Sequence, residues 1–324
     1  MRLKKKYLII YVVIIVNILC LHGCTLFREL SRNVVLNFSE MAKVKNKVHN
    51  PIRDDVHLSV LWVGHATMLI QMDDKVILTD PFFTNNIAEI QRRVIEPGMD
   101  LDDLKKCDLI LISHSHFDHL NYGTLRLLEY KFPKADLVFP EGMEEFIPDM
   151  NFTFHRVRKA GSGGDIYIGD TAIINGIKIT AVRAYHWGGR YGLDGLIWGY
   201  TAFTGYIIEY HGMTVYFTGD TIYDKKAFKY VGSKYSIDLI MIPIGPCKEC
   251  YKLGNIRHVY PRGALKILDD TKAKIFVPYH YGTIFEKSET PDTPKYVLMD
   301  LINNRPEYKN RVKIMEIGEQ IILK

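Results

Sequence analysis

The stretch His114-Ser115-His116-Phe117-Asp118-His119 places three imidazoles and one carboxylate within six consecutive residues. The apolar run Leu109–Ile112 just before it predicts a strand buried on both faces, and leucines at helical spacing follow over residues 120–130. The polar stretch therefore lies on a loop between a strand and a helix. Imidazole nitrogen and carboxylate oxygen are ligands that zinc prefers, so the stretch predicts a metal-binding loop rather than a solvated histidine-rich loop.

Further candidate ligands follow other predicted strands. His186, Asp220 and His280 each come directly after an apolar, β-branched segment. Because strand ends at one edge of a sheet converge, these side chains are expected to join the loop in one site. Asp80 also follows a predicted strand; if buried, its carboxylate can accept an imidazole N–H and fix the tautomer of a ligand. The alternative for Asp80 is an ordinary turn residue before a proline.

Strand-like and helix-like segments alternate through residues 56–324 without an internal repeat. Two sheets packed face to face with helices outside account for this mixture, so we expect an α/β (α+β) fold with the four layers αββα. No Pro/Ser/Gly-rich linker divides these residues, which favours one catalytic domain. The expected strands cover 57–62, 67–72, 75–79, 108–113, 135–139, 176–183, 201–210, 213–218, 239–242 and 274–277, and the expected helices 120–130 and 262–269.

The N-terminus has the composition of an export signal. Basic residues at positions 2–6 precede an apolar run over 7–21, which is short for a membrane-spanning helix. Leu21-His22-Gly23-Cys24 resembles a bacterial lipobox, although His22 departs from its usual small residue. We expect residues 1–23 to be a lipoprotein-type signal peptide, Cys24 to carry lipid, and residues 24–55 to be a basic tether. The protein is then an exported, membrane-anchored bacterial lipoprotein; an uncleaved signal anchor and a plain signal peptide are the alternatives.

The composition and the cysteines further restrict the class of protein and its partners. The 324 residues are 47% hydrophobic and 24% charged, as in an ordinary globular protein, and part of the net charge of +5 lies in the N-terminal lysines. We therefore expect no nucleic-acid partner. Beyond Cys107, the pair Cys247 and Cys250 has the spacing of a zinc knuckle or a redox pair. Without a second pair we expect no metal there, and a local disulfide can form in an oxidising compartment.

Taken in order, these motifs resemble the metallo-β-lactamase superfamily over nearly all of residues 57–324. The resemblance implies two Zn²⁺ or other divalent ions per chain, and it implies that Asp80 supports the histidine loop. Two adjacent ions can activate water and stabilise charge on an attacked carbonyl or phosphoryl group, with Asp118 and Asp220 as catalytic carboxylates. The resemblance assigns the first ion to His114, His116 and His186 and the second to Asp118, His119 and His280, and it implies that Asp220 bridges both.

Segments 61–67, 78–81, 184–190 and 197–200 together look like the branch that contains N-acylphosphatidylethanolamine-hydrolysing phospholipase D. The related ascorbate-6-phosphate lactonases share the Gly-His-Ala-Thr type of segment. The resemblance implies cleavage of such phospholipids to phosphatidate and N-acylethanolamine, with a membrane surface as partner. Aromatic residues near His186 and a basic tether also favour a phospholipid substrate, because aromatic side chains suit the headgroup zone and basic residues suit anionic lipids. The candidate substrate-binding residues are His65, Trp187, Trp198 and His258.

Each of these residues has a structural alternative. His65 either approaches the substrate or satisfies a buried turn, and His258 is otherwise a surface histidine at a helix start. Trp198 and the aromatics after it are otherwise core residues of a strand.

Other functions also stay open at this point. A lactonase or other small-ester hydrolase of the same fold uses the same ligands. A non-catalytic metal-binding lipoprotein is disfavoured, because a structural zinc site usually closes with four ligands, whereas seven are available here.

Overall fold

The computed structural model describes residues 40–87, 91–161, 165–191, 194–285, 290–303 and 305–324. The predicted signal segment 1–23 and the predicted lipidation site Cys24 lie outside these ranges. Within them, no helix has the length and apolar character needed to cross a membrane.

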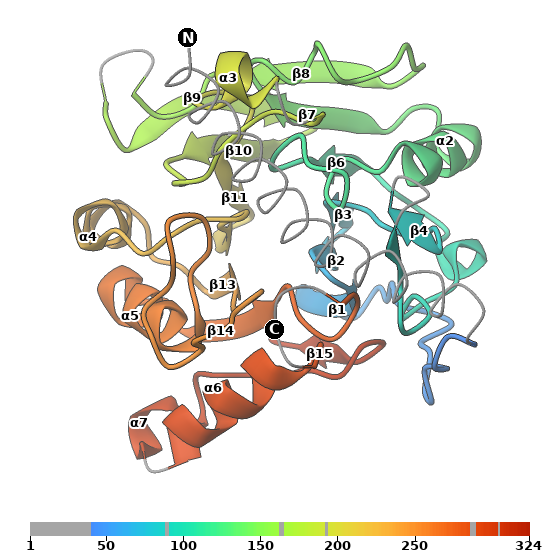
Figure 1. Ribbon diagram of the computed structural model, residues 1–324. Helices are drawn as coiled ribbons and strands as arrows, with labels where there is room; N and C mark the ends of the chain where they lie inside the picture. Colours follow the sequence, from blue (N-terminus) through green and yellow to red (C-terminus); the bar gives the residue numbers. More distant parts are fainter. Residues whose placement is uncertain (1–39, 88–90, 162–164, 192–193, 286–289, 304) are drawn as a thin grey trace, which may run out of the picture.

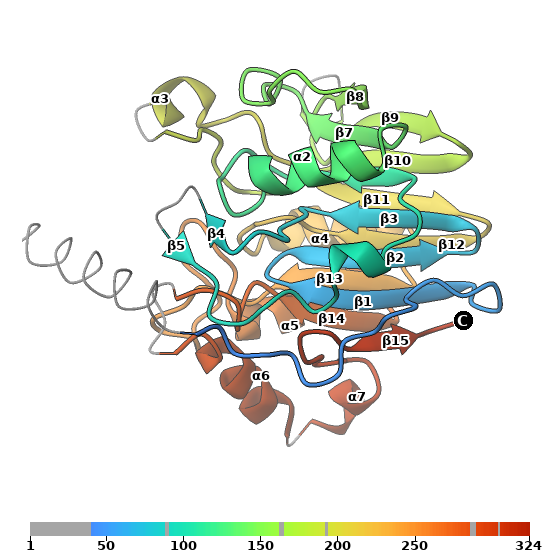
Figure 2. The same cartoon turned by 90° about the vertical axis from the view of Figure 1, so that its right-hand side faces the viewer.

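Two mixed β-sheets packed face to face form the centre of the fold (Figures 1 and 2). One sheet has seven strands in the order β15-β1-β2-β3-β6-β7-β8, and the other has six in the order β14-β13-β12-β11-β10-β9. The first sheet contains β1 (Leu58–Gly64), β2 (Thr67–Met72), β3 (Lys75–Thr79), β6 (Leu109–Leu111), β7 (Asp136–Pro140), β8 (Thr153–Val157) and β15 (Gln320–Ile322). The second contains β9 (Ile168–Ile174), β10 (Ile177–Val182), β11 (Gly205–Tyr210), β12 (Met213–Phe217), β13 (Leu239–Pro243) and β14 (Ile275–Tyr279). A small hairpin pairs β4 (Asn86–Ile87) with β5 (Gln91–Arg92).

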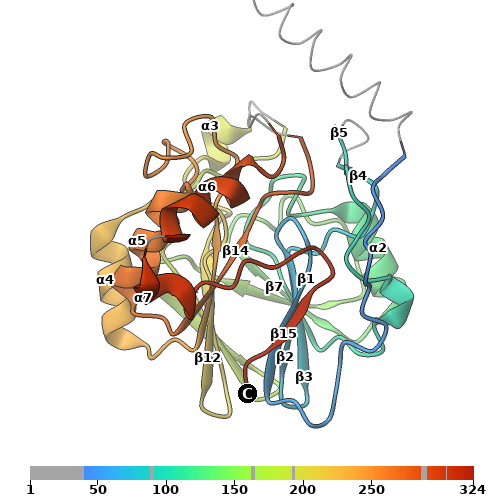
Figure 3. The same ribbon diagram turned by 90° about the horizontal axis from the view of Figure 1, so that it is seen from below.

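Helices cover the outer faces of both sheets. Figure 3 shows α2 beside the seven-stranded sheet and α4 to α7 beside the six-stranded sheet. The predicted four-layer αββα arrangement is therefore confirmed. The helices are η1 (Leu101–Asp103), α2 (Tyr122–Lys131), α3 (Gly195–Trp198), α4 (Lys225–Lys234), α5 (Pro261–Thr271), α6 (Thr293–Asn303) and α7 (Pro306–Lys309).

Strand β1, inside the seven-stranded sheet, is buried on both faces. In β1, Leu58, Val60 and Trp62 belong to the core between the sheets, whereas Leu61 and Val63 belong to the core beneath α2. All five side chains are at most 1% exposed. Because burying one such side chain contributes about 1.5–3 kcal/mol, a one-residue slip of the strand is strongly disfavoured.

The aromatic segment before β11 differs from the prediction. The strand expected over 201–210 begins at Gly205, and α3 occupies part of the preceding stretch. Ala202 has a left-handed backbone with φ of 59°, Phe203 forms an isolated bridge with His114, and Thr204 donates its N–H to the carbonyl of Ser113. These contacts hold the segment against the histidine loop instead of in the sheet, so the first four residues of the predicted strand are wrong.

Residues 40–55, which the sequence assigns to the tether, lie along the body and contain no helix. The Ala42 N–H donates to the carbonyl of Val94 at 2.9 Å, and the Glu96 N–H donates to Ala42 at 3.0 Å. The Val44 N–H donates to the Glu96 carboxylate at 2.8 Å. This part of the predicted tether is fixed to the domain by backbone hydrogen bonds.

Candidate metal centre

The strands that precede the candidate ligands all point toward one edge of the sandwich. In the first sheet β3 and β6 are parallel, and in the second β10, β12 and β14 share one direction. Residues that follow these strands therefore meet at the same edge. Asp80 follows β3, His114 follows β6, and His186, Asp220 and His280 follow β10, β12 and β14.

Three imidazoles form a first group of donors. His116 Nδ1 lies 2.8 Å from His114 Nε2 and 3.3 Å from His186 Nε2. Burial, together with the neighbouring imidazole of His186, lowers the pKa of His116 to about 3. The ring is therefore neutral at physiological pH, which is the form that binds metal. The structure brings together the three residues that the sequence assigns to the first ion.

Asp118, His119 and His280 form a second group. Asp118 Oδ2 lies 3.5 Å from His119 Nε2 and 3.6 Å from His280 Nε2, and the two imidazole nitrogens are 3.3 Å apart. These are the residues that the sequence assigns to the second ion.

Asp220 lies between the two groups. Its Oδ2 is 4.0 Å from His186 Nε2, 3.5 Å from His119 Nε2 and 3.2 Å from His280 Nε2. Burial favours the neutral acid, but His280 and His119 hold the pKa of this carboxyl well below its usual value. Asp220 is thus an ionised carboxylate within reach of both groups.

Asp80 orients the histidine loop through two chains of hydrogen bonds. Its Oδ2 accepts a hydrogen bond from His119 Nδ1 at 2.7 Å and one from the Ser113 hydroxyl at 2.6 Å. The Ser113 N–H donates to Oδ1 at 2.6 Å, and the Ser113 hydroxyl lies 2.9 Å from His114 Nδ1. Both His119 and Asp80 have fully buried side chains. Ser113 was not among the predicted site residues, although its place between a strand and the first histidine is visible in the sequence.

Hydrogen bonds orient two of the imidazole ligands. The carboxylate of Asp80 and the carbonyl of Arg257 can only accept, so His119 and His186 donate from Nδ1, the latter at 2.9 Å. The Nε2 atoms of both rings therefore face the centre, beside the other imidazole and carboxylate ligands. Imidazole nitrogen and carboxylate oxygen are the ligands that zinc and similar ions prefer, so the donor set fits divalent metal ions.

His65 belongs to the second group. It is 1% exposed, adopts φ of 52°, and places Nε2 2.9 Å from Asp118 Oδ2. Its ring centroid is 4.0 Å from that of His280. The structure thus places His65 in the metal centre as a partner of Asp118, and its substrate role stays a prediction.

Two of the other predicted substrate residues, His258 and Trp187, lie beside the first group. His258 Nδ1 is 3.4 Å from Asp220 Oδ2, and its ring is 5.1 Å from that of His186. The Trp187 ring lies 4.5 Å from the His116 ring. Trp198 ends α3, and its substrate role stays a prediction.

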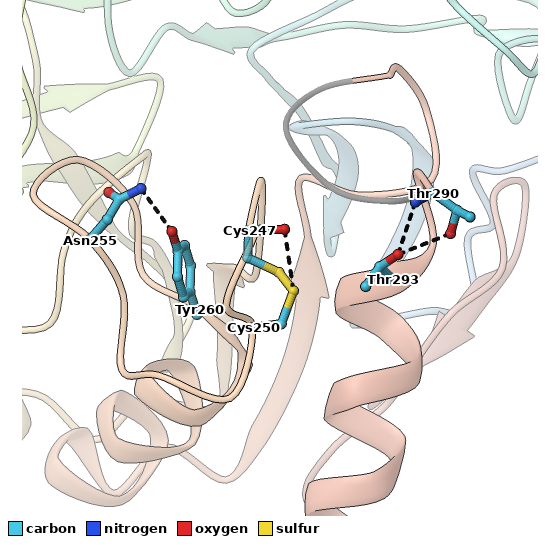
Figure 4. The surroundings of a disulfide bond; sticks show 6 residues. All are labelled: Cys247, Cys250, Asn255, Tyr260, Thr290 and Thr293. Carbon is cyan, nitrogen blue, oxygen red and sulfur yellow. Dashed lines mark hydrogen bonds between the residues drawn. A yellow bond between two sulfur atoms is a disulfide. The ribbon is translucent and has the colours of Figure 1, made fainter.

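The loop that carries His258 is held by local bonds. Cys247 and Cys250 form a disulfide near its start, and Asn255 donates to the Tyr260 hydroxyl at 2.9 Å near its end (Figure 4). The Val259 N–H donates to the carbonyl of Thr221, next to Asp220, at 2.7 Å. Among the described residues, none of the potential metal-binding groups includes the two cysteines. The pair thus takes the disulfide alternative that the sequence left open.

Comparison with known proteins agrees with this geometry. Residues 75–281, more than half of the chain, match the family described as Beta-lactamase superfamily domain. The chain is 26% identical over 289 residues to N-acyl-phosphatidylethanolamine-hydrolyzing phospholipase D 1 of Caenorhabditis elegans, which covers 84% of this chain and 79% of the relative. It is 26% identical over 267 residues to a metal-dependent hydrolase of Lysinibacillus sphaericus, which covers 82% and 99% respectively.

A solved structure shows the same fold. The metallo hydrolase from Ignicoccus hospitalis aligns with a TM-score of 0.59 at 22% identity, over 82% of this chain and 98% of that chain. The predicted family, fold and enzyme class are thereby confirmed. The chain belongs to the β-lactamase superfamily and is a metal-dependent hydrolase of the metallo-β-lactamase fold.

Proposed function

We propose that the protein holds two zinc or similar divalent ions and cleaves N-acylphosphatidylethanolamine-type phospholipids to phosphatidate and N-acylethanolamine. The observation that carries the choice of substrate is an amphipathic pocket beside the first group of ligands. The similarity to the nematode phospholipase D supports the same reaction.

The pocket has a volume of about 310 Å³ and is open to the surface beside His186. Its lining is mostly aromatic and aliphatic, which suits an acyl or glycerol segment of a lipid. The lining residues are Lys159, Ala160, Arg183, Ala184, Tyr185, His186, Tyr200, Phe203, Ile222 and Ile256.

Exposed apolar side chains occur both in the lining of this pocket and in the helix α3, which ends two residues before Tyr200. Tyr200 and Ile256, which line it, are 85% and 87% exposed, and Leu196 and Ile197 in α3 are 86% and 74% exposed. Figure 2 shows α3 at a corner of the molecule. Large exposed apolar side chains are unfavourable in water and favourable at the boundary of a bilayer. We therefore propose a lipid surface as the partner of this corner.

The residues of the centre have distinct tasks in the proposed reaction. The two groups of donors would hold divalent ions, and such ions would polarise the phosphoryl group and lower the pKa of a nearby water molecule. Asp118 and Asp220 keep the centre negatively charged, while Asp80 holds the histidine loop in position. His258, whose Nδ1 lies 3.4 Å from Asp220 Oδ2, forms part of the wall of the centre on the side of the first group.

The purified protein is expected to contain close to two divalent ions per chain, because Asp220 lies within 4.0 Å of nitrogen atoms from both groups. Elemental analysis after dialysis against a chelator and reloading with zinc measures this number. Full activity with one ion per chain, unchanged by added zinc, contradicts the two-ion proposal.

The bond that is cut can be identified with water enriched in heavy oxygen. When N-acylphosphatidylethanolamine is presented in vesicles, mass spectrometry is expected to find the label in phosphatidate and none in the N-acylethanolamine. Label in a free fatty acid indicates an esterase. No phospholipid turnover together with rapid lactone opening supports a lactonase with the same ligands.

Sedimentation with the same vesicles tests the proposed lipid surface. The wild-type protein is expected to sediment with the vesicles, whereas the double variant Leu196→Ser, Ile197→Ser is expected to stay in the supernatant. Equal sedimentation of the wild type and the double variant contradicts the proposed docking.

A further inference from the structure

Two cationic side chains line the pocket beside the metal centre, and no acidic side chain does. Lys159 and Arg183 both contribute to its wall. Within the described ranges, neither has a carboxylate at ion-pair distance. The carboxylates of Glu141 and Asp224 act on them over longer distances.

Aromatic rings hold both cations in place. Lys159 Nζ lies 4.8 Å from the centroid of the Phe203 ring, and the Arg183 guanidinium lies 4.3 Å from that of Tyr185. Arg183 Nη1 also donates to the carbonyl of Ile166 at 3.1 Å, whereas its Nε is buried without a hydrogen-bond partner in the described structure. The positions of these donors are therefore set before any ligand binds.

The two positive charges also act on each other. Burial, and then the charge of Arg183, lowers the pKa of Lys159. Half-buried cations without counterions are costly in free energy, and an anion bound between them relieves both the desolvation and the repulsion. The apolar side chains around them suit an anion attached to a hydrocarbon segment.

We propose that Lys159 and Arg183 form a subsite for an anionic group of the substrate that is separate from the scissile ester. The preferred substrate is then an amphiphile with an acidic group, such as a carboxylate, close to its apolar part. This inference rests on the proposed function, because it assigns the pocket at His186 to the substrate of the metal centre.

Binding of an amphiphile that cannot be hydrolysed tests the subsite independently of turnover. In calorimetry with the metal-loaded protein, octanesulfonate is expected to bind at least about tenfold more tightly than octanol, as one charge-assisted hydrogen bond implies. Lys159→Met and Arg183→Met should each reduce this ratio about tenfold. Lys159→Arg and Arg183→Lys keep the positive charge and should therefore keep most of the affinity ratio. Lys134→Met, which removes an exposed lysine, serves as the control. An unchanged ratio in both methionine variants overturns the subsite, since the sulfonate then binds elsewhere.

A pair of lipids that differ by one carboxylate tests the same subsite during turnover. N-acylphosphatidylserine is expected to show a kcat/KM about tenfold above that of N-acylphosphatidylethanolamine, and this preference should disappear in Lys159→Met. Equal values for the two lipids in the wild-type protein contradict the inference while leaving the phospholipase proposal intact. If neither lipid is cleaved but the sulfonate ratio behaves as expected, the subsite stands and the proposed phospholipid function fails.

Discussion

Asp220→Ala is expected to reduce turnover by at least about a thousandfold and to leave a folded protein with fewer than two ions per chain. The Asp220 carboxylate lies 3.2 Å from His280 and 4.0 Å from His186, so its removal takes a shared negative ligand from both donor groups. Metal ions supply several kcal/mol of transition-state stabilisation, and each 1.4 kcal/mol corresponds to about tenfold in rate. The fold should persist because Asp220 follows the end of β12 and does not pair within the sheet.

Turnover, elemental analysis and near-ultraviolet circular dichroism of the same preparation measure this outcome. Asp54→Ala, which removes an exposed carboxylate, is the matched control and should behave like the wild-type protein. Turnover of Asp220→Ala within tenfold of the wild type, with two ions still bound, refutes the bridging role.

Asp80→Asn is expected to lower the free energy of unfolding by about 3 kcal/mol and to reduce activity roughly 10- to 100-fold. The buried carboxylate accepts hydrogen bonds from His119 Nδ1, from the Ser113 N–H and from the Ser113 hydroxyl. An amide of the same size has one oxygen acceptor and presents an NH₂ group to the remaining donors. His119 then loses the contact that directs its Nε2 toward the centre.

Urea denaturation of the metal-free and the zinc-loaded protein separates the two effects. Without metal, the difference in the free energy of unfolding between Asp80→Asn and the wild type reflects the lost hydrogen bonds. With zinc bound, the same difference also includes any loss of metal affinity. Asp54→Asn again provides the control. Equal unfolding midpoints for Asp80→Asn and the wild type in both states would falsify the supporting role of Asp80.

The candidate ligands could be predicted because their signals are local. His114, His116, Asp118 and His119 lie in one short stretch after a buried strand, and His280 follows β14, which runs parallel to β13. The sequence analysis assumed that the strand ends converge, and the shared direction of the strands gathers these residues at one edge. The roles of His65 and Ser113 depend instead on contacts that form only in the folded chain, such as that of His65 with Asp118.

Several elements were missed because they bury few apolar side chains. β8 lies at the edge of its sheet and exposes most of its side chains, so it lacks an apolar run. In α4 only Ala227, Phe228 and Val231 are buried, and Gly232 interrupts the helical pattern. That glycine has a packing reason: an added Cβ would lie 2.6 Å from the Thr271 Cα in α5. Close helix contacts of this kind cannot be inferred from one chain segment alone.

The seven ligands come from loops at the ends of both sheets, and His119 and His280 are 161 residues apart in sequence. A chain with only its first sheet assembled has the histidine loop but lacks His186, Asp220 and His280, so neither group of donors is complete. We therefore expect metal binding to be coupled to the docking of the two sheets, so that ions held by both groups would favour the closed sandwich over partly opened states. Hydrolytic activity is then expected only in molecules that have finished folding.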